Sequence, residues 1–449
     1  MKRGVRTSSC FLRVIYLLII NLFLFSVGSL QALAEWTVLV YVQANNNLSQ
    51  YAEKNFYDMA SIGSTDNLNI LVEWHQLNKP GAWRYKIDKG KMTFDSCIAP
   101  ESDGNNPQDL VSAMQWAVNK YPAKKYSLVL WDHGIGILDP LWGRYRPWSN
   151  QKHLVDPKIV KNNPRIQING LTKKNHTTHF YPSKRVPDEA SKNQTRGILF
   201  NEQSRTYMTN QLLSLALSQI KTSVLGGKKI DLIGMDACLM AMVEIGYQTK
   251  NYADFLVASE EVELAHGWHY SSFLQLLKNG TLTPLQLAQS IVLTYELYYQ
   301  ERVPFFTQSA INLNNMDLLR ASLDNIVVLT QKCKNTNLNL GLLIKKARSS
   351  SLQFSAASYV DLHSFLTELQ NNLSTVSATN NALEELQKAI KTSIKIIEDS
   401  VIAHTAGKYL GRAKGLSIYY PTSGIDASYV KTDFAKESLW LCFLNELSS

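Results

Sequence analysis

Apolar runs of strand length alternate with helical stretches through the first two-thirds of the chain, and this alternation limits the possible folds more than any other feature. The runs are rich in β-branched and aromatic residues, which favours buried strands, and the stretches between them have the spacing of amphipathic helices. Strands joined by helices form parallel sheets with helices on both faces. We therefore expect an α/β fold with a mainly parallel sheet covered by helices on both faces. The strands are predicted at residues 36–42, 68–74, 126–131, 230–235 and 255–259, and the helices at 48–61, 210–220 and 239–249, with a further helix capped by Asn106.

The last third of the chain is more helical. Residues 283–286 (Thr-Pro-Leu-Gln) form a typical helix start, with a capping side chain and a proline in the first turn. Long helical patterns follow at 316–334 and 382–398. A chain of 449 residues is too long for one ordinary core. We expect an α/β domain over residues 35–280 and a mostly helical domain over 281–449.

The N-terminal 34 residues have the pattern of a secretory signal peptide. Four basic residues precede an apolar run at 14–27, and the small residues Ala32 and Ala34 mark a cleavage position before Glu35. The run is shorter than the roughly 20 residues of a membrane-spanning helix, and an uncleaved anchor is the alternative. We expect a secreted or periplasmic protein with no stable membrane insertion once residues 1–34 are removed.

The positive charge of the chain is concentrated in one segment. The whole chain has a formal charge of +9, and twelve basic residues against three acidic ones lie between Arg144 and Arg196. Residues 137–197 lack periodicity and are rich in proline, lysine and asparagine, which predicts a basic loop inserted into the α/β domain. A nucleic-acid surface instead needs basic residues spread over a folded face. We expect no nucleic-acid partner. The alternative, a binder of nucleic acid or acidic surfaces through this loop, predicts steep salt dependence.

His133 and Cys238 each follow a predicted strand directly. His133 comes after the strand at 126–131, and Cys238 comes after the strand at 230–235. In a parallel sheet, chemistry gathers beyond the carboxyl ends of the strands, so two neighbouring strands bring the imidazole and the thiol face to face. A thiol nucleophile needs such a base within reach. Taken alone, a cysteine between a strand and a helix is most often a small core residue.

Gly134 supports the catalytic interpretation of this pair. A glycine directly after the base lets a substrate come close to the backbone. Its N–H group and that of Cys238 can both point at the oxyanion that develops on a carbonyl group under attack. We expect these two N–H groups to form an oxyanion hole.

Two motifs together resemble the signatures of the clostripain family of cysteine peptidases, which are relatives of the caspases and gingipains. The first is Trp-Asp-His-Gly-Ile-Gly at 131–136, and the second is Asp-Ala-Cys-Leu-Met-Ala-Met-Val-Glu at 236–244. The resemblance spans most of the chain after the signal peptide. Further similar segments lie at 40–48, 258–268, 359–362 and 415–421.

The resemblance implies a caspase-like fold and a Cys-His dyad that requires no third acidic member. Cys238 is then the nucleophile, His133 the base and acid, and Gly134 with Cys238 the oxyanion hole. Family members cleave after arginine or lysine, and an acid two residues before the cysteine, here Asp236, helps to line the pocket for that side chain. From its position alone, Asp236 has an alternative role as a cap for the backbone at the turn from strand to helix.

One segment departs from the family pattern. Relatives often read Gly-Trp-Asp-Tyr where this chain has Gly-Trp-His-Tyr at 267–270. The absent acid leaves the preference between arginine and lysine open. Glu260, Glu261 and Glu263 are nearby substitutes, although a run of acids is more commonly a solvated surface.

Relatives are made as inactive single chains, and cleavage in a loop after the histidine strand activates them. The basic loop at 137–197 has this position and is rich in residues after which the enzyme is expected to cleave. We predict that Cys238 matures its own chain there, and that the uncut loop fills the pocket for basic side chains. The candidate positions are Arg144, Arg146, Lys173, Lys174, Lys184, Arg185 and Arg196.

The sequence therefore predicts a secreted, monomeric cysteine endopeptidase that cleaves proteins and peptides after arginine or lysine. The alternative is a non-catalytic binding protein that retains the caspase-like fold. The chemistry requires no cofactor. Calcium is needed by some family members, but this chain has no compact acidic loop of the EF-hand type. No zinc site is predicted, because His176 and His179 have no matching cysteine pair.

Overall fold

The computed structural model describes residues 33–98, 102–138, 197–278, 282–333, 339–376 and 381–448. Residues 1–32 of the expected signal peptide and residues 139–196 of the expected basic loop lie outside the described residues. Within the described ranges, no helix has both the length and the apolar composition that a membrane span requires.

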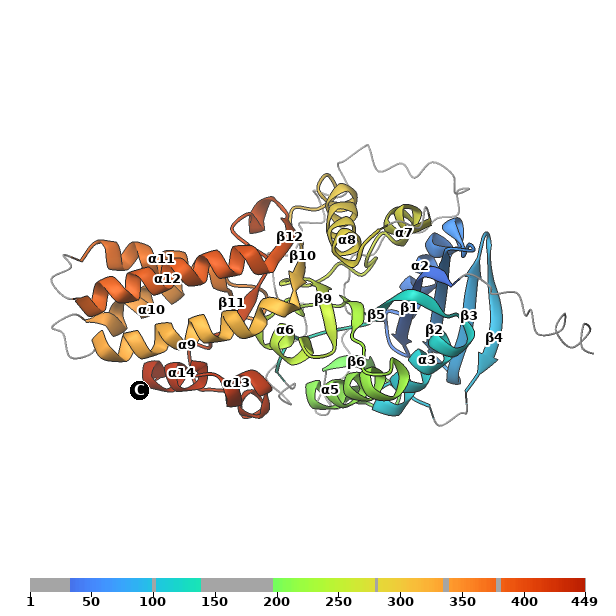
Figure 1. The fold of residues 1–449 in the computed structure, drawn as a ribbon, viewed down its shortest axis with the longest axis horizontal. Helices are drawn as coiled ribbons and strands as arrows, with labels where there is room; N and C mark the ends of the chain where they lie inside the picture. The colour runs from blue at the N-terminus through green and yellow to red at the C-terminus, as the bar shows by residue number, and fades with distance from the viewer. Residues whose placement is uncertain are drawn as a thin grey trace, which may run out of the picture.

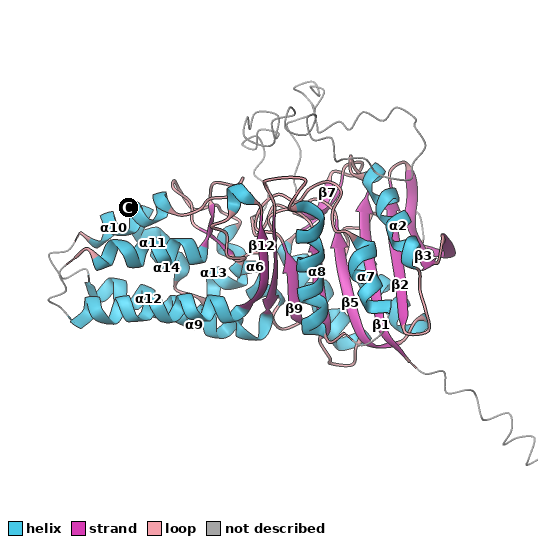
Figure 2. Ribbon diagram, turned by 90° about the horizontal axis from the view of Figure 1, so that it is seen from above, coloured by secondary structure: helices cyan, strands magenta, loops and turns pink. Residues whose placement is uncertain are grey.

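The centre of the fold is a sheet of nine described strands in the order β12-β10-β9-β8-β5-β1-β2-β3-β4. The five central strands, from β9 to β2, run parallel, and two antiparallel strands extend the sheet at each edge (Figure 2). All five strands predicted in the first two-thirds of the chain are these central ones, which confirms the mainly parallel sheet. The strands are β1 (Ala34–Ala44), β2 (Leu68–Gln76), β3 (Lys79–Asp88), β4 (Lys91–Cys97), β5 (Ala123–Trp131), β8 (Ile230–Asp236), β9 (Ala253–Ala258), β10 (Thr307–Asn312) and β12 (Val401–Ala406).

Helices cover both faces of the sheet, as predicted (Figure 1). Along β1, Val38 and Val40 pack into one apolar core with α2, α7 and α8, whereas Leu39 and Tyr41 pack into a second core with α3, α5 and α6. This alternation follows from the two-residue period of a strand. The helices are α2 (Ser49–Ile62), α3 (Pro107–Lys120), α5 (Asn210–Gln219), α6 (Val243–Thr249), α7 (Tyr270–Lys278), α8 (Pro284–Tyr299), α9 (Met316–Cys333), α10 (Leu340–Ser350), α11 (Leu362–Ser374), α12 (Asn381–Ser400), α13 (Asp433–Glu437) and α14 (Trp440–Ser448).

A helical region extends from the β12 edge of the sheet (Figure 1). In this region α9 packs against α12, and α11 packs against both α10 and α12. Strands β10 and β12, which come from the last third of the chain, add the antiparallel edge next to β9. Two small two-stranded sheets complete the fold: β6 (Ile198–Asn201) with β7 (Thr206–Met208), and β11 (Tyr359–Asp361) with β13 (Ser417–Tyr419).

Both helix starts that the sequence predicts are present. Asn106 caps α3, because its side-chain oxygen accepts a hydrogen bond from the N–H of Gln108 at 2.9 Å. Thr283 and Gln286 form a reciprocal capping box at the start of α8. Each cap satisfies N–H groups that a helix start otherwise leaves unpaired.

Candidate active site

His133 and Cys238 lie past the same edge of the sheet, on adjacent strands. Trp131 of β5 pairs with Asp236 of β8 in the parallel register. His133 and Cys238 each come two residues beyond this pair, and neighbouring strands are only about 4.8 Å apart. The N–H of Asp132 donates to the carbonyl of Asp236 at 3.3 Å, which extends the pairing toward the two residues.

Cys238 lies in a tight turn between β8 and α6. Leu239 has a left-handed backbone with φ of 64°, which is uncommon for a residue of its size. Its N–H donates to the carbonyl of Glu261 at 3.1 Å. Because Met242 then pairs with Ser417 of β13, α6 begins later than the helix predicted at 239–249.

The thiol of Cys238 is a weak acid in this environment. The N–H of Glu263 donates to Sγ at 3.3 Å. Burial raises the pKa of the thiol to about 12, and the carboxyls of Glu263 and Glu261 act in the same direction, while the N–H groups of Glu263 and Gly134 oppose the shift. The thiol is therefore protonated at neutral pH, and a nucleophilic role requires a base that removes its proton.

His133 contacts Asn47, a residue for which no individual role was predicted. The Nε2 atom of His133 lies 2.7 Å from Oδ1 of Asn47. Next to this contact, the buried Asn46 donates from Nδ2 to Oδ1 of Asp132 at 2.6 Å and to the carbonyl of Phe200 at 2.8 Å. These hydrogen bonds hold the segment after β1 against the segment after β5, and so keep Asn47 beside the imidazole. The asparagines fall in the family-like segment at 40–48, which was the only signal for them in the sequence.

Gly134 packs directly against the backbone of the cysteine. A Cβ atom placed on this glycine would lie 2.5 Å from the carbonyl oxygen of Cys238 and 3.1 Å from Cβ of Ala237. The close approach brings the N–H of Gly134 to the thiol, where it lowers the pKa of Cys238. The two residues predicted to form the oxyanion hole are therefore in contact.

Asp236 is the last residue of β8 and is buried, at 4% exposure. Its Oδ2 accepts hydrogen bonds from the N–H of Trp268 at 3.2 Å and from the hydroxyl of Tyr270 at 2.8 Å. Burial raises the pKa of Asp236 to about 6. Its carboxyl thus bonds to Trp268 and to the first residue of α7 and not, as the capping alternative proposed, to the turn that follows β8.

Glu263 shares this buried region with Asp236. Its Oε1 accepts from Nε1 of Trp268 at 2.8 Å and from Nε2 of Gln308 at 2.9 Å. Burial raises the pKa of Glu263 well above its usual value, and the charge of Asp236 adds to the shift. The described groups that act on these two carboxyls include no lysine or arginine.

The acidic run after β9 is buried, so the solvated alternative for it is wrong. Glu260, Glu261 and Glu263 are 1%, 5% and 8% exposed. Glu260 accepts from the N–H of Gly415 at 2.8 Å, and Glu261 accepts from the N–H of Ser355 at 3.0 Å. Of the three, Glu263 is therefore the one that lies with Asp236.

His269, which replaces the acid of many relatives, lies among aromatic and basic groups. Its ring stacks on Tyr298 at 4.4 Å between centroids, and its Nδ1 lies 2.5 Å from Oγ of Ser272. The guanidinium of Arg302 lies 4.3 Å from the centre of the Tyr298 ring. Burial lowers the pKa of His269, which favours the neutral ring. The residue therefore does not replace the negative charge of the acid found in many relatives.

The described parts of the chain show no convergence of three histidine, cysteine or carboxylate side chains that could hold a metal ion.

A caspase-like sheet with a cysteine and a histidine at its carboxyl edge is the arrangement found in a class of cysteine peptidases. The chain belongs to the clostripain family, whose family model matches residues 40–147 and 184–447. Members of this family are cysteine proteases, and their chemistry needs no cofactor. This confirms the resemblance and the enzyme class that the sequence predicted.

Solved structures agree on the fold. The X-ray structure of an inactive zymogen C11 protease from Parabacteroides distasonis has 17% identity and a TM-score of 0.57, over 90% of this chain and 98% of that chain. A secreted C11 cysteine protease from Bacteroides thetaiotaomicron, in complex with an irreversible peptide inhibitor, has 17% identity and a TM-score of 0.58, over 91% of this chain and 100% of that chain. No protein of curated function matches the chain.

Proposed function

We propose that this chain is a secreted, monomeric endopeptidase that cleaves after arginine or lysine, with Cys238 as nucleophile and His133 as base and acid. The register of β5 and β8, which sets both residues two positions beyond the same strand pair, is the observation that carries the proposal. Secretion is supported by the pattern of residues 1–34 and by the similarity to a secreted C11 cysteine protease.

The chemistry starts from a protonated thiol. His133 takes the thiol proton as the sulfur attacks the carbonyl carbon of the scissile bond. The N–H groups of Gly134 and Cys238 stabilise the oxyanion that forms. When the C–N bond breaks, the departing amine takes the proton from His133. Water, deprotonated by His133, then hydrolyses the thioester and frees the thiol.

Asn47 positions the base in this proposal. When Nε2–H of His133 donates to Oδ1 of Asn47, the neutral imidazole presents Nδ1 as its basic nitrogen. The contact therefore selects the tautomer and orients the ring. In this proposal Asn47 acts on the reaction through His133.

Replacing Asn47 by alanine is expected to lower kcat by roughly 10- to 100-fold, because general acid–base catalysis contributes about 10²–10⁴-fold in all. The Asn47→Asp variant keeps an acceptor and adds a charge that stabilises the imidazolium. It should recover much of kcat and move the acidic limb of the pH profile to higher pH. Asn119→Ala on the exposed end of α3 is the control. A loss in Asn47→Ala that Asn47→Asp neither rescues nor shifts in pH would contradict this role.

Asp236 and Glu263 form the proposed site for the basic side chain of the substrate. Asp236 precedes Cys238 by two residues, and the N–H of Glu263 contacts Sγ of Cys238. Two buried carboxyls without a described cation are unfavourable when ionised. The guanidinium of a substrate arginine, or the ammonium of a substrate lysine, supplies the positive charge that these two carboxyls lack. Both carboxyls are nearly inaccessible here, so we infer that the segment around Glu263 moves when substrate binds.

A panel of fluorogenic peptides ending in Arg, Lys, Asp or Leu tests the proposed specificity. The carboxyl of Asp236 is charged above its pKa of about 6 and neutral below it. We expect kcat/KM for the Arg and Lys peptides to fall as the pH is lowered through about 6. Asp236→Asn keeps the hydrogen bonds to Trp268 and Tyr270 but loses the charge, and should lower kcat/KM for Arg by roughly 10- to 100-fold at neutral pH.

The control for this panel is Asp66→Asn, which removes an exposed carboxyl. Equal hydrolysis of the Arg and Leu peptides by the wild type would reject the specificity. A purified and processed protein that hydrolyses none of the four peptides would favour the non-catalytic binding protein.

Self-processing completes the proposed function. Arg144, Arg146, Lys173, Lys174, Lys184, Arg185 and Arg196 all lie outside the described residues. Leu138 and Phe200, which lie on either side of the undescribed residues 139–196, both form hydrogen bonds near the active site. The N–H of Leu138 donates to the hydroxyl of Tyr359 at 3.3 Å, and the N–H of Phe200 donates to the carboxyl of Asp132. The described residues on both sides of this segment are therefore held next to the segment that carries His133, which supports cleavage of the segment by the same protein.

A further inference from the structure

The chain that follows β5 carries both His133 and Gly134, and its position determines how these two residues face Cys238. Residues 133–138 are named the histidine segment here. The structure assigns them to neither a helix nor a strand. Regular backbone pairing therefore does not fix the segment, and its position depends on the side chains that bond to its backbone.

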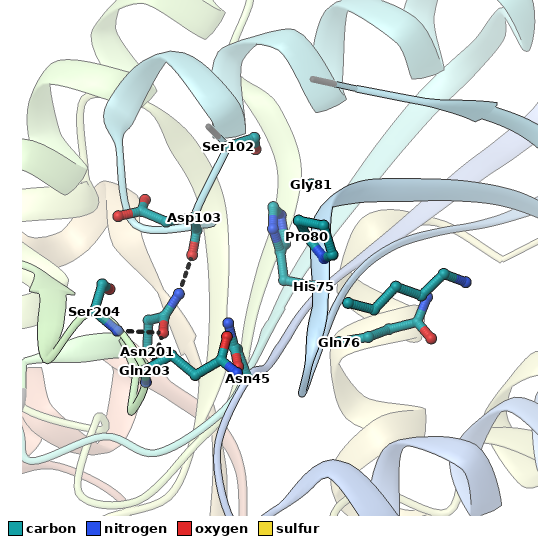
Figure 3. A pocket seen from close by; sticks show the side chains of 11 residues that line it. Asn45, His75, Gln76, Pro80, Gly81, Ser102, Asp103, Asn201, Gln203 and Ser204 are labelled. Atoms are coloured by element: carbon teal, nitrogen blue, oxygen red, sulfur yellow. Dashed lines mark hydrogen bonds between the residues drawn. The ribbon is translucent and has the colours of Figure 1, made fainter. Parts of the chain in front are cut away.

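The beginning of the histidine segment is held by β6. The N–H of Phe200 donates to the carboxyl of Asp132, the residue directly before the segment. The next residue, Asn201, donates from Nδ2 to the carbonyl of Asp103 at 2.9 Å, which ties β6 to the chain before α3 (Figure 3). These hydrogen bonds act on the chain before His133, so the residues after it need a support of their own.

Tyr359 of β11 supplies that support. It is buried, at 1% exposure, and its hydroxyl donates to the carbonyl of Ile135 at 2.6 Å. The same hydroxyl accepts from the N–H of Leu138 at 3.3 Å. The donated bond is short for its type and the accepted bond is long for its type, so the donated bond contributes most. A Cβ atom placed on Gly136 would lie 2.7 Å from Cε2 of Tyr359, so the ring also packs directly on the segment.

The antiparallel partner of β11 is bonded to the other half of the site. This partner, β13, pairs with β11 in a small sheet. The N–H of Ser417 in β13 donates to the carbonyl of Ala241 at 2.9 Å. The N–H of Tyr419 donates to Oε1 of Glu244, also at 2.9 Å. Both acceptors belong to the chain that leaves Cys238 and enters α6.

The sheet of β11 and β13 therefore connects the two catalytic segments. One of its strands is bonded to the chain after His133, and the other is bonded to the chain after Cys238. Both strands come from the last third of the sequence. A connection of this kind fixes the distance between the imidazole and the thiol, and a misplacement of about 1 Å can cost about 10²-fold in rate.

We propose that Tyr359 is a positioning residue for the peptidase reaction, and that its hydroxyl holds the histidine segment at the spacing from Cys238 that proton transfer requires. The proposal rests on the proposed function, because Tyr359 acts through His133 and Gly134 and has no chemistry of its own. The alternative is that the hydroxyl contributes only to the stability of the fold.

The Tyr359→Phe variant removes the hydroxyl and keeps the ring. We expect it to lower kcat for a fluorogenic arginine peptide by about 10- to 100-fold with little change in KM, because only the alignment of the reacting groups is lost. Tyr420→Phe is the matched control. Tyr420 directly follows β13, and its buried hydroxyl has no hydrogen-bond partner among the described residues. This variant should keep the wild-type kcat.

Alkylation of Cys238 by iodoacetamide at neutral pH reports the spacing directly. The thiol reacts as a thiolate, and His133 is the base that takes its proton. Cys238 should therefore react faster in the wild type than in His133→Ala. In Tyr359→Phe its rate should fall toward that of His133→Ala. A hydroxyl that only stabilises the fold would leave the rate unchanged in the folded protein.

The other cysteines serve as internal controls, read by peptide mass mapping of the same samples. Cys97 and Cys442 are exposed and should react at the same rate in every variant, whereas Cys333 is buried and reacts only when the protein unfolds. If Tyr359→Phe exposes Cys333, Asn210→Ala is measured in its place. Nδ2 of Asn210 donates to a carbonyl of the histidine segment at 2.9 Å, so this variant loosens the same segment from α5 and should lower both kcat and the alkylation rate.

The outcomes separate this proposal from the proposed function. If Cys238 reacts no faster in the wild type than in His133→Ala, and the arginine peptide is not cleaved, the proposed function fails. If the wild type cleaves the peptide but Tyr359→Phe matches Tyr420→Phe in kcat and in alkylation rate, the positioning role is rejected. Wild-type values in Asn210→Ala, where that variant is needed, reject it as well.

Discussion

Replacing Cys238 by alanine is expected to lower kcat by about 10⁴- to 10⁶-fold, because the reaction loses the atom that attacks the carbonyl carbon. The fold should remain intact. The described hydrogen bonds of Sγ involve only the backbone of Glu263 and of Gly134, and alanine removes one small atom from the turn after β8. Hydrolysis of a fluorogenic arginine peptide and thermal unfolding, measured on the same preparation, separate catalysis from stability. A variant that retained wild-type turnover would exclude Cys238 as the nucleophile.

The same variant tests whether the protein processes itself. Purified wild type is expected to be cut at one or more basic positions between residues 139 and 196, and Cys238→Ala is expected to remain a single chain. Cys442→Ala, which changes an exposed cysteine, should be cut like the wild type. Intact mass and N-terminal sequencing identify the positions. If Cys238→Ala purified alone is cut at the same positions, another protease makes the cuts and self-processing is wrong.

The central sheet and the placement of His133 and Cys238 could be predicted from the sequence because the five parallel strands are buried on both faces. Such strands read as continuous apolar runs, and their connections alternate with them in a regular way. Once two such runs are neighbours in a parallel sheet, the residues after them share an edge. The prediction therefore needed only the ends of the strands and not the details of packing.

The antiparallel edge formed by β10 and β12 was missed because β10 lacks that apolar signal. Its residues Gln308 and Ser309 are polar, yet both are fully buried. Gln308 donates to Glu263, and Ser309 donates to the carbonyl of Gly415 at 2.7 Å. Polar side chains can occupy a strand interior when distant residues satisfy them, and no local pattern in a sequence reveals those partners.

The contacts of the active site were missed for the same reason. Asn47 meets His133 only because the segments after β1 and β5 are hydrogen-bonded together by Asn46 and Asp132. Asp236 and Glu263 share a buried region although like charges usually avoid each other. Two like-charged carboxyls close together are expected at a functional site, because a bound substrate offsets the repulsion between them.

Replacing Gly134 by alanine keeps the backbone N–H but should displace it from the site, and we expect kcat to fall by about 10²–10³-fold, as when one oxyanion-hole donor is lost. The new Cβ would lie 2.5 Å from the carbonyl oxygen of Cys238, and both contacting groups are held by backbone. The segments that carry the base and the nucleophile must then move apart, so we also expect a loss of roughly 1–3 kcal/mol in stability. Gly341→Ala is the control, since a Cβ there meets no atom within 4 Å.

Stability and catalysis are separated by measuring kcat at a temperature where Gly134→Ala is fully folded by circular dichroism. A loss of kcat under those conditions reports the geometry of the site, because His133 and Cys238 are both still present and only their spacing has changed. Gly341→Ala lies in α10, where alanine is a better helix former than glycine by about 1 kcal/mol, and should unfold at the same or a higher temperature. Wild-type kcat in Gly134→Ala would mean that the close approach of residue 134 to Cys238 is not needed for the reaction.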